Sequence, residues 1–315
     1  MKIQPTSSRR LLRESFTFNA GLGLELFVQS GDYKIVQLAN GTFSVHSLAE
    51  RETFHPVIGP VAEAEALYVN QLKLRQRLAN YSGEFIVWDV GLGAAANVLT
   101  VLRATKDIPS VIRIVSFDHK IASLKFAVNN AESLGYFLDY EMRVRNFIEK
   151  GRINFRNEKQ TVTWEFHLGD FPTLLTHSLS HSPTHAFPAP DAILFDAFSP
   201  AKNPAMWTLP LFTNLFRLLD PARPCAMPTY SRATMLRVTL LLAGFFVGVG
   251  HATGEKEETT IAANTMALIE EPLRKKWLER VGKSKSAEPM FEPVYEQRPI
   301  SAESWEHLQN HPQFR

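Results

Sequence analysis

Cysteine, net charge and long apolar runs are the features that this sequence has least of. Its single cysteine, Cys225, excludes an internal disulfide and a cysteine-rich metal site, and it fits a reducing compartment. The formal net charge is only +2 at pH 7. Any contact with nucleic acid would therefore have to come from a local basic patch rather than from an overall polycation.

Signals for export and for membrane insertion are missing as well. The start, Met1-Lys-Ile-Gln-Pro, has no apolar signal-peptide core. The most apolar run, residues 236–249, is too short and too interrupted by glycine to span a bilayer. We therefore expect a cytoplasmic protein that has no membrane partner.

The chain does have enough apolar residues for a large core. With 315 residues, 45% of them hydrophobic, one large domain with appendages is the expected organisation. We expect an N-terminal arm and a small β appendage over residues 1–55, with a hairpin around Asn40-Gly41. The main domain would cover residues 56–271, and a charged, proline-punctuated tail, partly helical or disordered, would cover residues 272–315.

The main domain is organised around the stretch 85–99. Residues 85–90 are apolar and β-prone and contain Asp89, then Gly91 and Gly93 follow, and a helical run starts near Ala94. A strand, a tight glycine turn and a helix start let a ligand approach backbone that a Cβ would block. The pattern by itself is also that of an ordinary strand-to-helix turn.

Strands and helices then alternate along the chain, which predicts an α/β fold. The expected strands are residues 85–90, 111–117, 162–168, 192–195 and 225–230. The expected helices are residues 61–74, 94–102, 121–135, 211–219 and 232–243, with helix and loop at 136–160 and a loop at 176–190. We predict a doubly wound, mostly parallel Rossmann-like sheet with a terminal antiparallel hairpin at residues 245–251 and 260–270.

Acidic residues follow three of these strands, at Asp118, Asp170 and Asp196. The ligand crevice of an open α/β sheet lies beyond the carboxyl ends of its strands, and a carboxylate accepts hydrogen bonds from neighbouring ribose hydroxyls. A helix cap explains any one of the three equally well. Three in register with a glycine turn favour a nucleoside ligand, and the compact turn suits S-adenosylmethionine better than a dinucleotide, with an oxidoreductase as the alternative.

The histidines give weaker signals. His177, His181 and His185 lie four residues apart, but in a proline-interrupted segment without carboxylates, so we expect no metal. His55 either faces the site or marks the approach to a helix, and the sequence favours neither interpretation.

These residues resemble the class I S-adenosylmethionine-dependent methyltransferases. More narrowly, Phe195-Asp-Ala-Phe-Ser-Pro-Ala-Lys-Asn-Pro-Ala-Met-Trp-Thr-Leu-Pro-Leu-Phe resembles the methyltransferase domain of the MnmC family, which makes 5-methylaminomethyl-2-thiouridine in tRNA. The supporting pieces are Glu52-x-x-His-Pro-x-x-Gly-Pro-x-x-Glu-Ala, Gly91-x-Gly-x-x-x-Asn, Tyr230-Ser-Arg and Gly254-Glu-Lys-Glu-Glu-Thr-Thr-Ile-Ala. The resemblance covers residues 30–270, approximately, and leaves no room for the flavin oxidase domain that is fused to some members.

The resemblance implies S-adenosylmethionine as the cofactor. Asp118 would bind its ribose, Asp170 its adenine side and the turn from Gly91 to Asn97 its methionine end. The implied cofactor-binding residues are Asp89, Gly91, Gly93, Asn97, Asp118 and Asp170. Asp196 would be the catalytic residue, orienting the primary amine of 5-aminomethyluridine at the tRNA wobble position behind the transferred methyl group.

Contacts with the tRNA anticodon stem-loop would come from aromatic and basic side chains. Phe198, Trp207 and Tyr230 either stack on an extruded uridine or belong to the core. Lys202, Arg232 and Lys256 either bind phosphates or are solvated surface residues.

One residue departs from the family's turn. Ala95 stands where relatives have glycine, and alanine is disfavoured in a left-handed conformation. Two alternatives to a tRNA methyltransferase stay open. The weak net charge leaves open a methyltransferase for a small amine, and Ala95 leaves open a catalytically silent RNA-binding relative.

Overall fold

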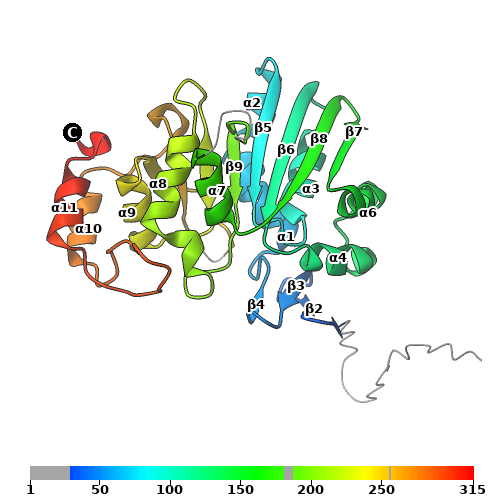
Figure 1. Ribbon diagram of the computed structural model, residues 1–315, viewed down its shortest axis with the longest axis horizontal. Coiled ribbons are helices and arrows are strands. Elements are labelled where there is room, and N and C mark those ends of the chain that lie inside the picture. Colours follow the sequence, from blue (N-terminus) through cyan, green and yellow to red (C-terminus); the bar gives the residue numbers. More distant parts are fainter. Residues whose placement is uncertain (1–28, 181–186, 255–256) are drawn as a thin grey trace, which may run out of the picture.

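An eight-stranded sheet forms the centre of the molecule (Figure 1). The computed structural model describes residues 29–180, 187–254 and 257–315. The strand order is β11-β12-β10-β9-β5-β6-β8-β7. The strands are β5 (Glu84–Val90), β6 (Ser110–Asp118), β7 (Arg152–Asn157), β8 (Gln160–Leu168), β9 (Ala192–Phe195), β10 (Ala226–Thr229), β11 (Phe246–Gly250) and β12 (Thr259–Ala263). Strands β10, β9, β5, β6 and β8 run parallel, whereas β11, β12 and β7 pair antiparallel, which confirms the predicted sheet and its terminal hairpin.

A separate four-stranded antiparallel sheet precedes the main sheet (Figure 1). Its strands are β1 (Gln29–Ser30), β2 (Tyr33–Gln37), β3 (Phe43–Ser47) and β4 (Glu52–Thr53). The predicted hairpin is confirmed, and the Asn40 side chain stabilises its turn by accepting the Thr42 N–H at 3.1 Å and donating to the Ile58 carbonyl at 3.0 Å. The expected N-terminal arm lies outside the described residues.

The central strands are buried on both faces, because helices cover the sheet from both sides. In β5, Phe85 and Val87 join one apolar cluster, and Ile86, Trp88 and Val90 join the other. The first face is covered by α1 (Pro60–Ala64), η1 (Glu65–Asn70), α2 (Leu74–Ala79), α3 (Ala96–Thr105), α4 (Ala122–Asn129), α5 (Ala131–Leu134), η2 (Leu138–Tyr140), α6 (Glu141–Lys150) and η5 (Met266–Leu268). The second is covered by α7 (Phe171–Ser180), η4 (Pro204–Trp207), α8 (Leu209–Leu218), α9 (Thr234–Leu242), α10 (Trp277–Lys283), α11 (Ala302–Gln309) and η6 (Pro312–Phe314).

Three expected elements are wrong in detail. The single helix expected at residues 61–74 is divided into α1, the π-helix η1 and α2. The left-handed Lys73, with φ 50°, separates η1 from α2. The helix and loop expected at residues 136–160 include the edge strand β7. Its apolar residues, Ile153 and Phe155, alternate with polar ones, but this six-residue pattern was not assigned to a strand. The loop expected from residue 176 is still helix α7 up to Ser180.

The C-terminal tail packs onto the edge of the sheet beside β11, at the opposite end of the molecule from β7 (Figure 1). The Gln313 side chain accepts the Val247 N–H at 2.8 Å and donates to the Val247 and Leu273 carbonyls at 2.7 and 2.8 Å. One amide side chain thus satisfies backbone groups of an edge strand. None of the helices in the described ranges is long and apolar enough to cross a membrane.

Asp191 joins the amino ends of β5 and β9. Its carboxylate is 1% exposed and accepts hydrogen bonds from the Ile86 N–H at 2.7 Å, the Tyr81 hydroxyl at 2.8 Å and Arg223 Nε at 2.7 Å. A buried carboxylate is stable only with such partners, because desolvation of the charge is costly.

We expect Asp191→Ala to lower the free energy of unfolding by about 2–3 kcal/mol, because Arg223 and the Ile86 N–H lose their acceptor. Because Arg223 is partly exposed, the expected loss of stability is smaller than that for a fully buried ion pair. Urea denaturation followed by circular dichroism measures the change.

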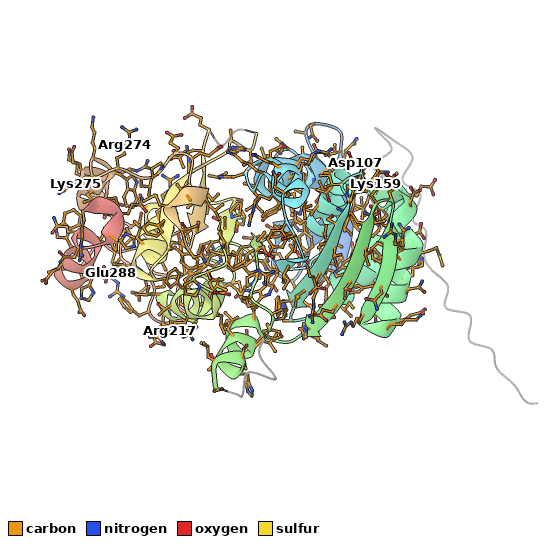
Figure 2. All side chains as sticks on the ribbon, turned by 90° about the horizontal axis from the view of Figure 1, so that it is seen from above. Asp107, Lys159, Arg217, Arg274, Lys275 and Glu288 are labelled. Carbon is orange, nitrogen blue, oxygen red and sulfur yellow. The ribbon has the colours of Figure 1, made fainter. Side chains whose placement is uncertain are left out.

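The matched control is Asp107→Ala. Asp107 also pairs with an arginine, Arg75, at 2.8 Å, but it lies at the surface (Figure 2). Its loss is expected to change stability little. Equal losses for the two variants would contradict the structural role assigned to Asp191.

Candidate functional site

A cavity of about 800 Å³ lies beyond the carboxyl ends of β5, β6, β8 and β9. This volume is within the range of small-molecule and cofactor sites, and the place is where open α/β sheets bind ligands. The loops after these strands form the floor, and residues 50–56 from the small sheet form one wall. Its polar and charged lining residues include Glu52, His55, Glu63, Asn97, Asp118, Asp170 and Asp196.

The glycine turn after β5 allows two close approaches. Gly91 has φ 93°, and a Cβ there would lie 2.6 Å from the Asp196 carbonyl oxygen. Gly93 has φ 51°, donates its N–H to Asp118 Oδ2 at 3.0 Å, and would place a Cβ 3.3 Å from the Phe54 ring. The two glycines therefore bring together the ends of β5, β6 and β9 and the wall of the cavity.

Ala95 adopts the left-handed conformation that glycine favours. Its φ and ψ are 60° and 14°, and it is the N-cap residue of α3. The conformation costs an L-residue about 1–2 kcal/mol. Ala95 is buried in the apolar core and is not among the residues that line the cavity. The strain therefore lies beneath the turn, and the alanine methyl group does not narrow the site.

Asp118 and Asp170 both line the cavity, and both already hold backbone groups. Asp118 Oδ1 accepts the Lys120 N–H at 3.2 Å and lies 3.2 Å from His119 Nδ1. Asp170 Oδ2 accepts the N–H and the hydroxyl of Thr173 at 3.1 and 2.6 Å. Asp170 thus caps the start of α7 and also lines the cavity. A role as a helix cap is therefore compatible with a role in binding a nucleoside.

Asp89 lies below the cavity and does not line it. It is 1% exposed and accepts the Ser116 hydroxyl at 2.7 Å. Burial, with smaller contributions from the charges of Asp196 and Asp118, raises the pKa of Asp89 to about 7 against the opposing Ser116 hydrogen bond. Asp89 therefore lies beneath the glycine turn, near the end of β5, and not in the cavity.

Three aromatic side chains hold the backbone around Asp196. The Tyr68 hydroxyl donates to the Phe195 carbonyl at 3.2 Å, and the Tyr230 hydroxyl donates to the Ala197 carbonyl at 3.0 Å. The Trp207 indole N–H donates to the Phe198 carbonyl at 2.8 Å. The carbonyls of Phe195, Ala197 and Phe198 are thereby satisfied, which fixes the path of the loop after β9.

The Asp196 side chain belongs to a buried charged cluster. Asp196 Oδ2 accepts from Asn97 Nδ2 at 2.8 Å and lies 3.5 Å from His55 Nε2, while His55 Nδ1 lies 3.4 Å from Glu63 Oε1. Burial lowers the pKa of His55, but the charge of Asp196 and the hydrogen bond and charge of Glu63 outweigh it and raise the pKa to about 9. One ligand atom from each of His55, Glu63 and Asp196 lies within 4.8 Å of the others, a spacing that a metal ion could also accept.

The small sheet is tied directly to the loop after β9. Glu52 accepts the Ser199 N–H at 3.2 Å and also the Ser199 hydroxyl. Phe54 and Phe198 meet edge to face with ring centroids 5.6 Å apart. The appendage predicted from the sequence is therefore a wall of the site.

The residues expected to contact substrate occupy different environments. Phe198, Lys202 and Tyr230 line the cavity. Trp207 is 1% exposed and packs against Phe195 and Phe212, so its ring has no face on which a base could stack. Arg232 is exposed and does not line the cavity, whereas Lys256 lies outside the described residues.

Of the histidines spaced four apart, His177 lies on α7, and His181 and His185 are outside the described residues.

Sequence analysis left the roles of Glu52 and Glu63 unassigned and that of His55 undecided. All three belong to the string Glu52-x-x-His-Pro-x-x-Gly-Pro-x-x-Glu-Ala, so a signal was present. Nothing in that string showed that it would meet residues 196–199, more than 130 residues later, across the cavity.

The chain was compared with known proteins. A family model of S-adenosyl-L-methionine-dependent methyltransferases matches residues 141–265. The tRNA 5-methylaminomethyl-2-thiouridine biosynthesis bifunctional protein MnmC of Pseudomonas putida is 25% identical over 68% of this chain and 32% of its own length. MnmC of Pseudoalteromonas atlantica is 28% identical over 62% of this chain and 29% of its own length. The chain thus spans about a third of the length of these curated relatives.

A solved structure shows the same fold. The crystal structure of MNMC2 from Aquifex aeolicus superposes with a TM-score of 0.62 at 20% identity, covering 89% of this chain and 84% of its own. Together these similarities show an MnmC-like methyltransferase domain.

The cavity fits S-adenosylmethionine. Asp118 and Asp170 follow neighbouring strands, where a nucleoside would lie, and the glycine turn offers close approach to the start of α3. Asn97 Oδ1 is buried and accepts no hydrogen bond from the described part of the chain. An ammonium group at the methionine end would supply the missing donor.

We expect Gly91→Ala to lower the free energy of unfolding by about 3 kcal/mol or more and to displace Asp196, because strain at positive φ is added to a backbone clash. Urea denaturation and calorimetry of S-adenosylmethionine binding measure the two effects.

Gly83→Ala is the control, since Gly83 has a similar φ of 103° but nothing within 4 Å of an added Cβ. This substitution is expected to lower the free energy of unfolding by about 1–2 kcal/mol and to leave cofactor binding unchanged. If both variants lost equal stability and both bound the cofactor normally, the contact between Gly91 and Asp196 would not be tight.

Proposed function

We propose that this protein transfers a methyl group from S-adenosylmethionine to the primary amine of 5-aminomethyl(-2-thio)uridine at the wobble position of tRNA. The observation that carries the proposal is the position of Asp196. Its largely enclosed carboxylate, 17% exposed, follows β9 and lines the same cavity as Asp118 and Asp170. It belongs to the string from Phe195 to Phe212 that resembles the MnmC family.

The cofactor would lie across the ends of β5, β6 and β8. Asp118 would accept from its ribose hydroxyls, Asp170 would lie at its adenine side, and Asn97 and the turn after β5 would hold its methionine end. When bound, S-adenosylmethionine supplies a methyl group on a positively charged sulfur. The role of the chain is then to align the acceptor amine with that group.

An alkyl amine is largely protonated at neutral pH and has no lone pair to donate. Asp196 would accept a hydrogen bond from the ammonium group, take one of its protons and pass it to solvent. The amine lone pair then forms the N–C bond as the C–S bond breaks and its electron pair remains on sulfur. The carboxylate also stabilises the positive charge that develops on nitrogen.

The substrate end of the cavity is suited to an extruded base. The rings of Phe198 and Tyr230 line it, and Lys202 lies exposed on the same loop. Arg51 and Lys120 add basic groups to the lining. A stacked base with flanking phosphates on cations is the common form of single-stranded RNA recognition.

The decisive assay is transfer of labelled methyl from S-adenosylmethionine to tRNA taken from cells that lack this methylation. We expect label in the wobble uridine with the native protein. Asp196→Asn keeps the side-chain volume but removes the base, and it should lower kcat about a hundredfold or more. Its affinity for S-adenosylmethionine, measured by calorimetry, should change less than threefold, approximately.

The results that contradict the proposal are distinct. Equal loss of kcat and cofactor affinity in Asp196→Asn would make Asp196 a cofactor ligand. Cofactor binding without label in any tRNA would favour a small amine as acceptor. Absence of cofactor binding would favour a catalytically silent relative.

Binding of tRNA should weaken as salt increases, because phosphate contacts release counterions. Lys202→Ala should lower the affinity about threefold to tenfold at low salt and reduce the slope of log Kd against log salt by about one. Fluorescence anisotropy with an anticodon stem-loop measures both.

Lys275→Ala serves as the charge-matched control. Lys275 lies just before α10, at the opposite end of the molecule from Asp107 and Lys159 (Figure 2), and it does not line the cavity. Binding that did not respond to salt, or an equal effect of the two substitutions, would remove the proposed phosphate contact.

A further inference from the structure

His55 is held on both sides of its ring by carboxylates. Nδ1 faces Glu63 from α1 at 3.4 Å, and Nε2 faces Asp196 after β9 at 3.5 Å. The side chains of His55 and Glu63 are 7% and 6% exposed. The three groups therefore interact in a low dielectric, where charge pairs are strong and an uncompensated charge is costly.

The backbone of His55 is itself in an unusual state. Its φ is 50°, a left-handed value that is uncommon for a residue with a side chain. Strain of this kind persists where the surroundings determine the conformation, and it gathers at functional sites. The neighbouring Phe54 packs on Phe198, and Glu52 holds Ser199, so the segment carrying His55 is tied to the loop that carries Asp196.

We propose that His55 is a positioning residue that remains a cation between Glu63 and Asp196, so that Asp196 stays ionised and oriented to accept the proton of the substrate amine. The inference rests on the proposed function and adds to it the residue, His55, that keeps Asp196 ionised.

Charge balance explains why a cation is needed. Without His55, the Glu63 and Asp196 carboxylates, which are 6% and 17% exposed, would face each other with oxygens within 4.8 Å, and one of them would take up a proton. A protonated Asp196 could no longer accept a proton from the amine. His55 itself neither gains nor loses a proton during transfer, since the amine proton goes to Asp196 and then to solvent.

Other ionisable residues share the cavity with His55. They are Tyr33, Glu50, Arg51, Glu52, Asp118, His119, Lys120, Asp170, Lys202 and Tyr230. The charges that raise the pKa of His55 are those of Asp196 and Glu63, and burial opposes them. This pKa is raised to about 9. The stabilising interaction of the His55 cation with Glu63 and Asp196 is therefore fully present below the ordinary histidine pKa of about 6.5 and is lost as pH rises through about 9.

The first experiment measures the protonation of His55 without catalysis. Histidine-selective NMR of the whole protein, assigned by the signal that disappears in His55→Gln, should show a ring that titrates near pH 9. In Asp196→Asn the midpoint should move to lower pH. A ring that is neutral at pH 7 in the native protein would overturn the inference.

The second experiment uses methyl transfer to tRNA across pH. His55→Gln should lower kcat tenfold or more at pH 7, leave the KM for S-adenosylmethionine nearly unchanged, and move the acid limb of the kcat profile to higher pH. The double variant His55→Gln/Glu63→Gln should recover part of the lost activity, because Asp196 no longer faces a second carboxylate. A purely structural role for His55 would not produce this recovery.

His307→Gln, on the exposed face of α11, is the control for the substitution itself and should match the native protein. A native profile in His55→Gln, or no recovery in the double variant, overturns the inference while the proposed function stands. Lack of transfer by the native protein to any tRNA removes both. One equivalent of metal found by mass spectrometry, and lost in His55→Gln, would replace the cationic bridge with a metal site.

Discussion

The close passage of Gly91 against the backbone of Asp196 is the constraint on which the site depends. A side chain at residue 91 would lie 2.6 Å from the Asp196 carbonyl, so only glycine lets β5 and β9 end side by side in this way. Asn97, the second residue of α3, then reaches the Asp196 carboxylate at 2.8 Å. The glycine turn therefore fixes the positions of Asn97 and Asp196 relative to each other in the lining of the cavity.

The small N-terminal sheet completes this arrangement. A Rossmann-like sheet alone leaves the crevice beyond its strands open on one side. Here β4 and the segment after it close that side, with Glu52 on Ser199 and Phe54 on Phe198. Burying three ionisable groups behind this wall is costly in isolation, and their alternation of negative, positive and negative charge is what makes the arrangement stable.

Parts of the molecule could be predicted from sequence because their causes are local. Alternating strands and helices, a glycine turn after a buried strand, and Asn40-Gly41 between two β-prone segments each act over a few residues. Two local features were nevertheless missed. The alternation of Ile153 and Phe155 with polar residues in β7 covers only six residues, and no local pattern predicted the left-handed Lys73 before α2. The acidic residues after the strands were recognised because parallel strands end at one edge of the sheet.

The sequence by itself determined the doubly wound sheet and the residues Gly91, Gly93, Asn97, Asp118, Asp170 and Asp196 around one crevice, since chain order and strand direction bring them there. Only the tertiary structure decided which side chains face that crevice. It placed Trp207 in the core, Asp89 beneath the turn and the methyl group of Ala95 outside the cavity. It also brought His55 and Glu63 to Asp196, because contacts between segments more than 130 residues apart depend on how the layers pack, and no local pattern records that packing.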